Sequence, residues 1–85
     1  MSHHQVEKRF AATQVSDTRL DDIALSAAQI LQTVGHPLQG AELLALTVTH
    51  AECSCAEALK GVKHAVANNL VASYQEKEHI MYAPK

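Results

Sequence analysis

Aromatic side chains are scarce in this sequence, whose 85 residues include one Phe, two Tyr and no Trp. A core with so few rings has to be built from aliphatic side chains and alanine. Glycine and proline are also few, with three and two residues. Because alanine has the best helix propensity and strands favour branched and aromatic side chains, this composition argues against a large sheet. We expect one small, mainly helical domain.

An excess of positive charge is also missing. Seven Lys and Arg stand against nine Asp and Glu, giving a formal net charge of −2. This balance argues against a protein that coats nucleic acid without sequence preference, but a small basic patch is enough for a sequence-reading domain. No apolar run approaches the roughly 18 residues of a transmembrane helix, and the N-terminus has no apolar secretory signal. We therefore expect a soluble, cytoplasmic protein with no membrane partner.

Only two cysteines are present, Cys53 and Cys55, and they lie one residue apart. This spacing excludes an ordinary disulfide framework. With His50 they form H-x-x-C-x-C, and one of four other histidines, His3, His4, His36 or His79, could complete a metal site. A structural zinc site takes four ligands at recognisable spacings, however, and only three are local here. A thiol in the first turn of a helix would also suit redox or metal sensing. We favour the simpler interpretation that Cys55 packs as a small apolar residue and Cys53 lies in a turn, and we predict no metal or cofactor.

Motifs of catalysis are not found. The sequence has no Ser-His-Asp order, no glycine-rich phosphate loop and no H-E-x-x-H helix. A helical domain of this length also offers few concave sites of the size that enzymes use. We therefore expect no enzymatic activity.

Hydrophobic periodicity predicts two helices before the cysteines. Apolar residues keep helical spacing from Leu20 to Val34, and Ser16 or Asp17 is a suitable cap for that helix. Gly35 is a good C-cap, and a proline two residues later prevents the helix from continuing. After an extended pair at 38–39, residues 40–48 predict a second, shorter helix, and residues 47–53 a turn. Residues 1–16 show no clear period and are predicted to be a flexible tail.

The third predicted helix spans residues 54–70. Ser54 and Glu57 have the spacing of a capping box, in which each side chain bonds to the other residue's backbone N–H. The apolar stripe expected to face the core is Ala58, Leu59, Val62, Ala65, Val66, Asn69 and Leu70. Two short runs of β-forming residues then follow, VASYQ and IMYAP, separated by residues 76–79. They predict a hairpin with a charged tip.

This order of elements resembles the winged helix-turn-helix family over residues 17–85. The resemblance is carried by IALSAAQILQTVGHPLQGAELLALT for the first two helices, SCAEALKGVKHAVANNLV for the third, and ASYQEKEHIMYAP for the wing. It implies three helices followed by a β-hairpin, with the third helix in the DNA major groove and the wing against the backbone or minor groove. The tip EKEH differs from many family wings, which carry several basic residues.

The resemblance also assigns candidate contacts to double-stranded DNA. They are Lys60, Lys63, His64 and Asn68 on the third helix and Lys77 in the wing. Lysine pairs with guanine edges or phosphates, and asparagine suits adenine. We expect a sequence-specific transcriptional regulator, which would gain affinity as a homodimer on two half-sites. The alternative is a winged-helix module that binds another protein and no nucleic acid, for which the net negative charge and the acidic tip argue.

Overall fold

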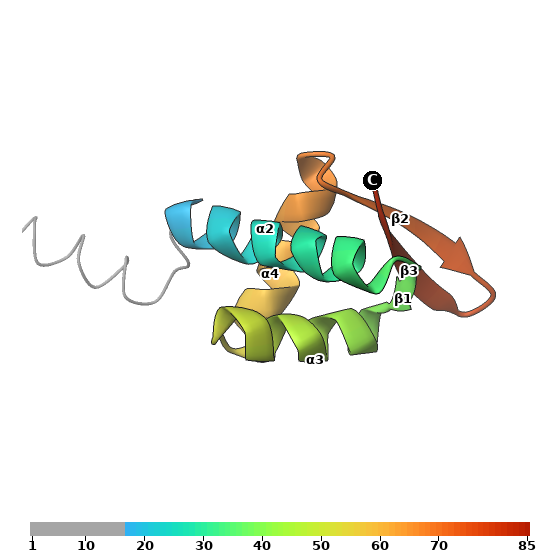
Figure 1. The fold of residues 1–85 in the computed structure, drawn as a ribbon. Coiled ribbons are helices and arrows are strands. Elements are labelled where there is room, and N and C mark those ends of the chain that lie inside the picture. The colour runs from blue at the N-terminus through green and yellow to red at the C-terminus, as the bar shows by residue number, and fades with distance from the viewer. Residues whose placement is uncertain (1–16) are drawn as a thin grey trace, which may run out of the picture.

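Helices and a small sheet follow one another in the order that the sequence predicts. The computed structural model describes residues 17–85, so the predicted tail 1–16 and the candidate cap Ser16 lie outside the described residues. The elements are α2 (Asp17–Val34), β1 (Leu38–Gln39), α3 (Gly40–Ala51), α4 (Cys55–Ala67), β2 (Val71–Glu76) and β3 (His79–Pro84) (Figure 1). The expectation of a mainly helical chain with a C-terminal wing is confirmed.

The first helix ends where its sequence indicates. Gly35 adopts a left-handed conformation with φ of 80°, and its N–H donates to the Leu31 carbonyl at 2.9 Å. A left-handed residue at this position closes a helix at little cost when it has no Cβ. Pro37 then leads the chain into β1. The predicted boundary at Val34 is thus confirmed, together with its cause.

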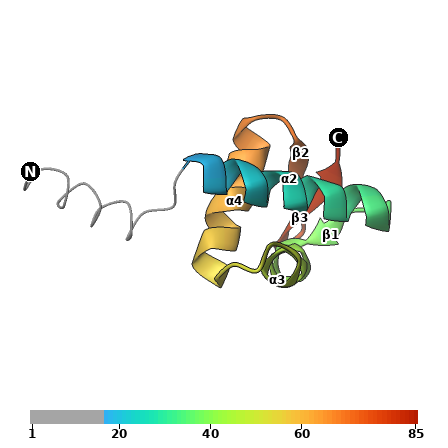
Figure 2. The ribbon, with the colours of Figure 1, turned by 60° about the vertical axis from the view of Figure 1, so that its left-hand side comes forward.

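The strands form one antiparallel sheet in the order β1-β3-β2. The hairpin β2-β3 is in register from Val71 opposite Pro84 to Glu76 opposite His79, and β1 joins β3 through Leu38 opposite Tyr82. The connection is therefore the pair Lys77 and Glu78, shorter than the predicted tip 76–79, because both flanking residues are paired. In Figure 2 the sheet lies to the right of α4, and α2 crosses in front of it.

Two helix boundaries differ from the prediction. α3 continues to Ala51, so residues 47–51 are helical where a turn was expected, and a left-handed Glu52 with φ of 51° ends the helix. α4 ends at Ala67 instead of residue 70, because Asn68 is its C-cap and Asn69 is left-handed with φ of 61°. The turn between α3 and α4 is therefore only residues 52–54, as short as a helix-turn-helix requires.

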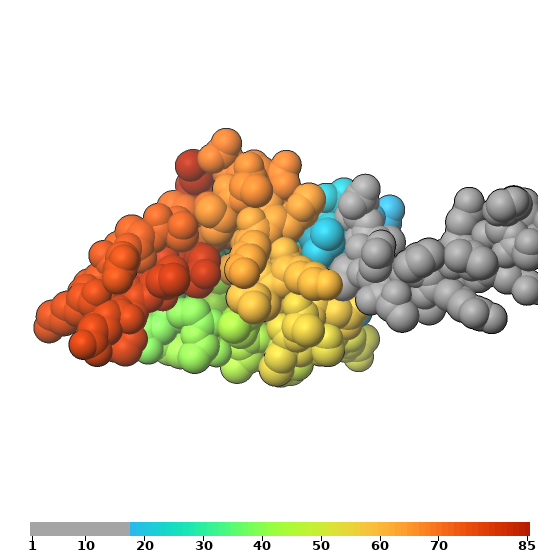
Figure 3. Space-filling model, turned by 180° about the vertical axis from the view of Figure 1, so that it is seen from behind, coloured from blue at the N-terminus to red at the C-terminus, as the bar shows by residue number. Residues whose placement is uncertain are grey.

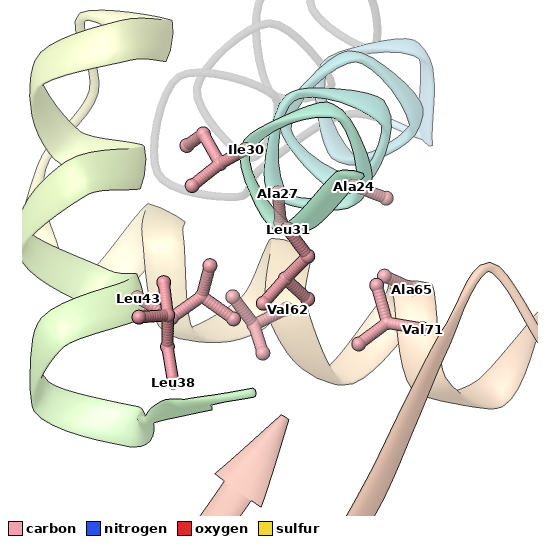
Figure 4. Close-up of a cluster of buried hydrophobic side chains, with 9 residues drawn as sticks. All are labelled: Ala24, Ala27, Ile30, Leu31, Leu38, Leu43, Val62, Ala65 and Val71. Carbon is pink, nitrogen blue, oxygen red and sulfur yellow. The ribbon is translucent and has the colours of Figure 1, made fainter. Parts of the chain in front are cut away.

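The core lies where α2, α3 and α4 meet the inner end of the sheet. Figure 4 shows its main cluster, formed by Ala24, Ala27, Ile30, Leu31, Leu38, Leu43, Val62, Ala65 and Val71. All are aliphatic, as the scarcity of aromatics indicates. Two residues of the apolar stripe predicted for α4 do not face the core. Leu59 is 39% exposed, and Asn69 is exposed beyond the end of the helix.

Candidate nucleic-acid interface

The start of α4 is fixed by the predicted capping box. The Glu57 N–H donates to Ser54 Oγ at 3.1 Å, and the Ser54 N–H donates to Glu57 Oε1 at 3.0 Å. Arg19 of α2 adds two contacts from outside the helix. Its guanidinium donates to the Glu52 carbonyl at 3.1 Å, and its Nε lies 3.6 Å from Glu57 Oε2. One side chain of α2 therefore holds both the turn and the first residues of α4.

These contacts make the helix start sensitive to acid. The Ser54 N–H, helped by the Arg19 guanidinium, lowers the pKa of Glu57 below that of an ordinary glutamate. A carboxyl whose pKa is lower in the folded state stabilises the fold above its unfolded pKa, near 4.3, and this stabilisation is lost as the pH falls through its folded pKa. Glu57→Gln should therefore lower stability at pH 7 and change it little near pH 3.

Urea unfolding followed by circular dichroism at both pH values measures this loss. Glu78→Gln is the matched control, because Glu78 lies in the hairpin turn and forms no ion pair within residues 17–85. Equal losses at pH 7 and pH 3 for Glu57→Gln would show that the carboxylate charge does not stabilise the capping box.

The outward face of α4 carries the two lysines proposed to contact DNA. Lys60 and Lys63 are exposed and lie three residues apart, on one side of the helix. Ala56 and Ala67 continue this side at spacings of four and are also exposed. Neither lysine has an ion-pair partner within residues 17–85. Seen from behind, α4 and the β2-β3 hairpin lie on the same face of the molecule (Figure 3).

His64 and Asn68 have partners inside the protein. His64 Nε2 lies 2.7 Å from Asp21 Oδ1 of α2, and the Asn68 side-chain amide donates to the His64 carbonyl at 2.8 Å. His64 is also only 28% exposed at its side chain. Both residues therefore fix the last turn of α4 in this structure, and a contact with a base would compete with these bonds.

Lys77 lies at the tip of the hairpin. It has φ of 56°, and its carbonyl accepts a 3.4 Å hydrogen bond from the Gln75 side chain. Glu76 and Glu78 are its neighbours, and all three are exposed. The tip thus presents one positive and two negative side chains. It therefore differs from the basic wings of many winged-helix proteins, as its sequence indicates.

Of the favoured interpretation of the cysteines, the position of Cys53 in a turn is confirmed and the packing of Cys55 is wrong. Cys53 is the buried one and packs with Ile23 and Ala58, whereas Cys55 is exposed at the first position of α4. Burial, with the nearby Glu57 carboxylate, raises the pKa of the Cys53 thiol, and its Sγ lies 3.9 Å from the Thr47 carbonyl. Cys55 is exposed because it begins α4 on the side of the helix away from the core, whereas Cys53 in the turn contacts Ile23 and Ala58. Within the described residues, no three His, Cys, Asp or Glu side chains are arranged to hold a metal ion.

Two positioning contacts were missed from the sequence. The contact between Asp21 and His64 joins residues 43 positions apart, and that between Arg19 and Glu52 joins residues 33 apart. No local spacing indicates such pairs.

Comparison with known proteins identifies no relative. No family model, curated protein or solved structure matches the chain. In the part of the chain that the structure describes, the helices are too short or too polar to cross a bilayer.

Proposed function

We propose that this protein is a sequence-specific DNA-binding transcriptional regulator in which α4 enters the major groove. The observation that carries the proposal is the outward side of α4, where Lys60 and Lys63 are exposed and without an ion-pair partner among residues 17–85. A helix of 13 residues is about 20 Å long, and the major groove, about 12 Å wide, admits it.

The side chains around the two lysines suit a close approach. Ala56 and Ala67 lie one turn before and after them on the same side, and both are exposed. Small side chains at these positions let the helix backbone come near the groove floor, while the longer lysines reach phosphates or guanine edges. His64 and Asn68 act in this proposal by holding the helix end, through Asp21 and the His64 carbonyl.

The helix is also held rigidly enough to read a sequence. Its N-terminus is capped by Ser54 and Glu57 and contacted by Arg19, and its last turn is held by Asp21. A recognition helix fixed at both ends loses little conformational entropy on binding, which favours specificity. The wing adds one cation, Lys77, between two carboxylates, so most of the binding energy has to come from α4.

Loss of both lysines should abolish most of the affinity for DNA. Each lysine–phosphate contact changes the slope of log K against log salt by about 0.9, so Lys60→Ala with Lys63→Ala should lower this slope by about 2. The affinity itself should fall at least about tenfold at low salt. Fluorescence polarisation measures both quantities, with a duplex selected from a random-sequence library and a scrambled duplex.

Lys85→Ala is the matched control, because it removes a lysine from the last residue, outside α4 and the hairpin turn. It should leave the salt slope nearly unchanged. An unchanged slope for the double variant, or equal affinity for selected and scrambled duplexes, would refute sequence-specific reading by α4.

The acidic hairpin tip supports one alternative function. Glu76 and Glu78 are exposed beside Lys77, and Leu59 is 39% exposed on α4. A winged-helix module that binds a protein partner would use such a mixed surface. Passage through a heparin column at low salt distinguishes the two, because retention that depends on Lys60 and Lys63 favours DNA.

A further inference from the structure

A shallow groove runs between α2 and α3 and is not used by the proposed DNA contact. It has a volume of about 560 Å³, and its lining residues all belong to these two helices. Leu25 of α2 and Leu46 of α3 stand at its sides, 49% and 44% exposed. Ile30 and Val34 form part of its floor. Most of the surface that lines the groove is apolar.

The depth of the groove favours a broad partner over a small ligand. Six of its nine lining residues are exposed. Sites for small molecules enclose 70–90% of the ligand surface, which needs walls that are mostly buried. An open hollow between two helices instead suits packing against another helical surface.

The charge of the groove favours a second copy of this chain. Its lining contains no Asp, Glu, Lys or Arg, although the chain as a whole has a formal net charge of −2. In a two-fold dimer a residue on the symmetry axis faces its own copy, so a charge at the centre of the interface would face a like charge. Two copies that meet through a patch without charged side chains avoid this repulsion between like charges.

The size of this face is close to the minimum for a dimer. α2 and α3, with 18 and 12 residues, are about 27 and 18 Å long, and two packed helices are about 20 Å wide. The face thus offers about 400–500 Å² on each copy, or about 800–1,000 Å² in total, which lies in the range of weak, transient interfaces below about 1,200 Å². The dimer should therefore be weak and dependent on concentration.

We propose that two copies of this protein associate through the α2–α3 groove, with Leu25 and Leu46 of each copy entering the groove of the other. No lining residue comes from α4 or the hairpin, so both α4 helices stay uncovered. Such a dimer would place its two α4 helices on two DNA half-sites, and this role rests on the proposed DNA-binding function. The dimer itself does not depend on DNA.

Light scattering and sedimentation equilibrium of the full chain, without DNA, test the proposal. The mass should rise with concentration from 9.2 kDa towards twice that value between about 5 and 500 µM. Leu25→Glu and Leu46→Glu should each raise the dissociation constant at least about tenfold, because a carboxylate would be buried without a partner. Leu59→Glu, on α4 and similarly exposed, is the matched control and should leave it unchanged.

Two results would overturn the dimer. One is a wild-type chain whose mass stays at 9.2 kDa at every concentration. The groove would then belong to a different occupant, such as another protein, a ligand or another segment of this chain. The other is a dimer that Leu59→Glu dissociates and the groove variants do not. The wild-type measurement needs no variant, so misfolding of a variant does not affect it. A dimer without DNA affinity would refute the proposed function only, and DNA affinity in a strict monomer would refute this inference only.

Discussion

Gly61→Ala should destabilise the fold by about 2 kcal/mol or more, although alanine is the better helix former by about 1 kcal/mol. A Cβ at Gly61 would lie 2.1 Å from Ile23 Cγ2 and 2.6 Å from Ile23 Cβ. Ile23 is fully buried and β-branched, so it has little freedom to move aside. The added methyl group would therefore push α4 away from α2. Urea unfolding gives the free energy of unfolding.

Gly40→Ala is the control for this prediction. A Cβ at Gly40 would meet the Tyr82 ring at 3.4 Å, an ordinary contact, so its effect should stay within about 0.5 kcal/mol. The clash at Gly61 is tested further by a double-mutant cycle with Ile23→Ala, which removes Cγ2. The double variant should lose less stability than the sum of the two single variants. Strict additivity would show that the two helices are not in close contact at this point.

Leu31→Ala should cost about 3 kcal/mol of unfolding free energy. Its side chain is fully buried in the main core cluster, and truncation leaves both the lost transfer energy and a cavity. A domain of 85 residues has a total stability of about 4–13 kcal/mol, so this loss is a large fraction of it and should lower the unfolding temperature strongly. Thermal and urea unfolding together measure the loss.

The same substitution at Leu59 provides the comparison. Leu59 is 39% exposed on α4, so Leu59→Ala should cost less than about 1 kcal/mol. Similar losses at the two positions would mean that Leu59 is covered in solution. That result would place a partner on α4 and favour the protein-binding alternative.

Local patterns predict the elements of this fold well. Periodicity and the pair Gly35 and Pro37 locate α2, and the Ser54–Glu57 spacing locates the start of α4, because each depends on residues within one or two turns. The β-forming runs locate the hairpin for the same reason. The sequence also indicates an extended pair at residues 38–39. It does not indicate that β1 pairs with β3, because this pairing joins residues more than 40 positions apart.

The remaining features depend on how the helices meet. Cys53 is buried because it packs against Ile23 of α2, and Gly61 is buried because α4 crosses α2 at that residue. Of the five candidate DNA contacts, Lys60, Lys63 and Lys77 are exposed in the structure, while His64 has a partner from another helix and Asn68 bonds to the His64 carbonyl. A helical pattern indicates which side a residue is on, but not which distant side chain meets it there.

The two polar contacts that α2 makes with α4 start from residues only two positions apart. Arg19 reaches the first turn of α4, and Asp21 reaches its last turn. Both ends of α4 are therefore tied to the beginning of α2, in addition to the apolar packing between the two helices. A change in the beginning of α2 would therefore act on both ends of the helix that carries the exposed lysines.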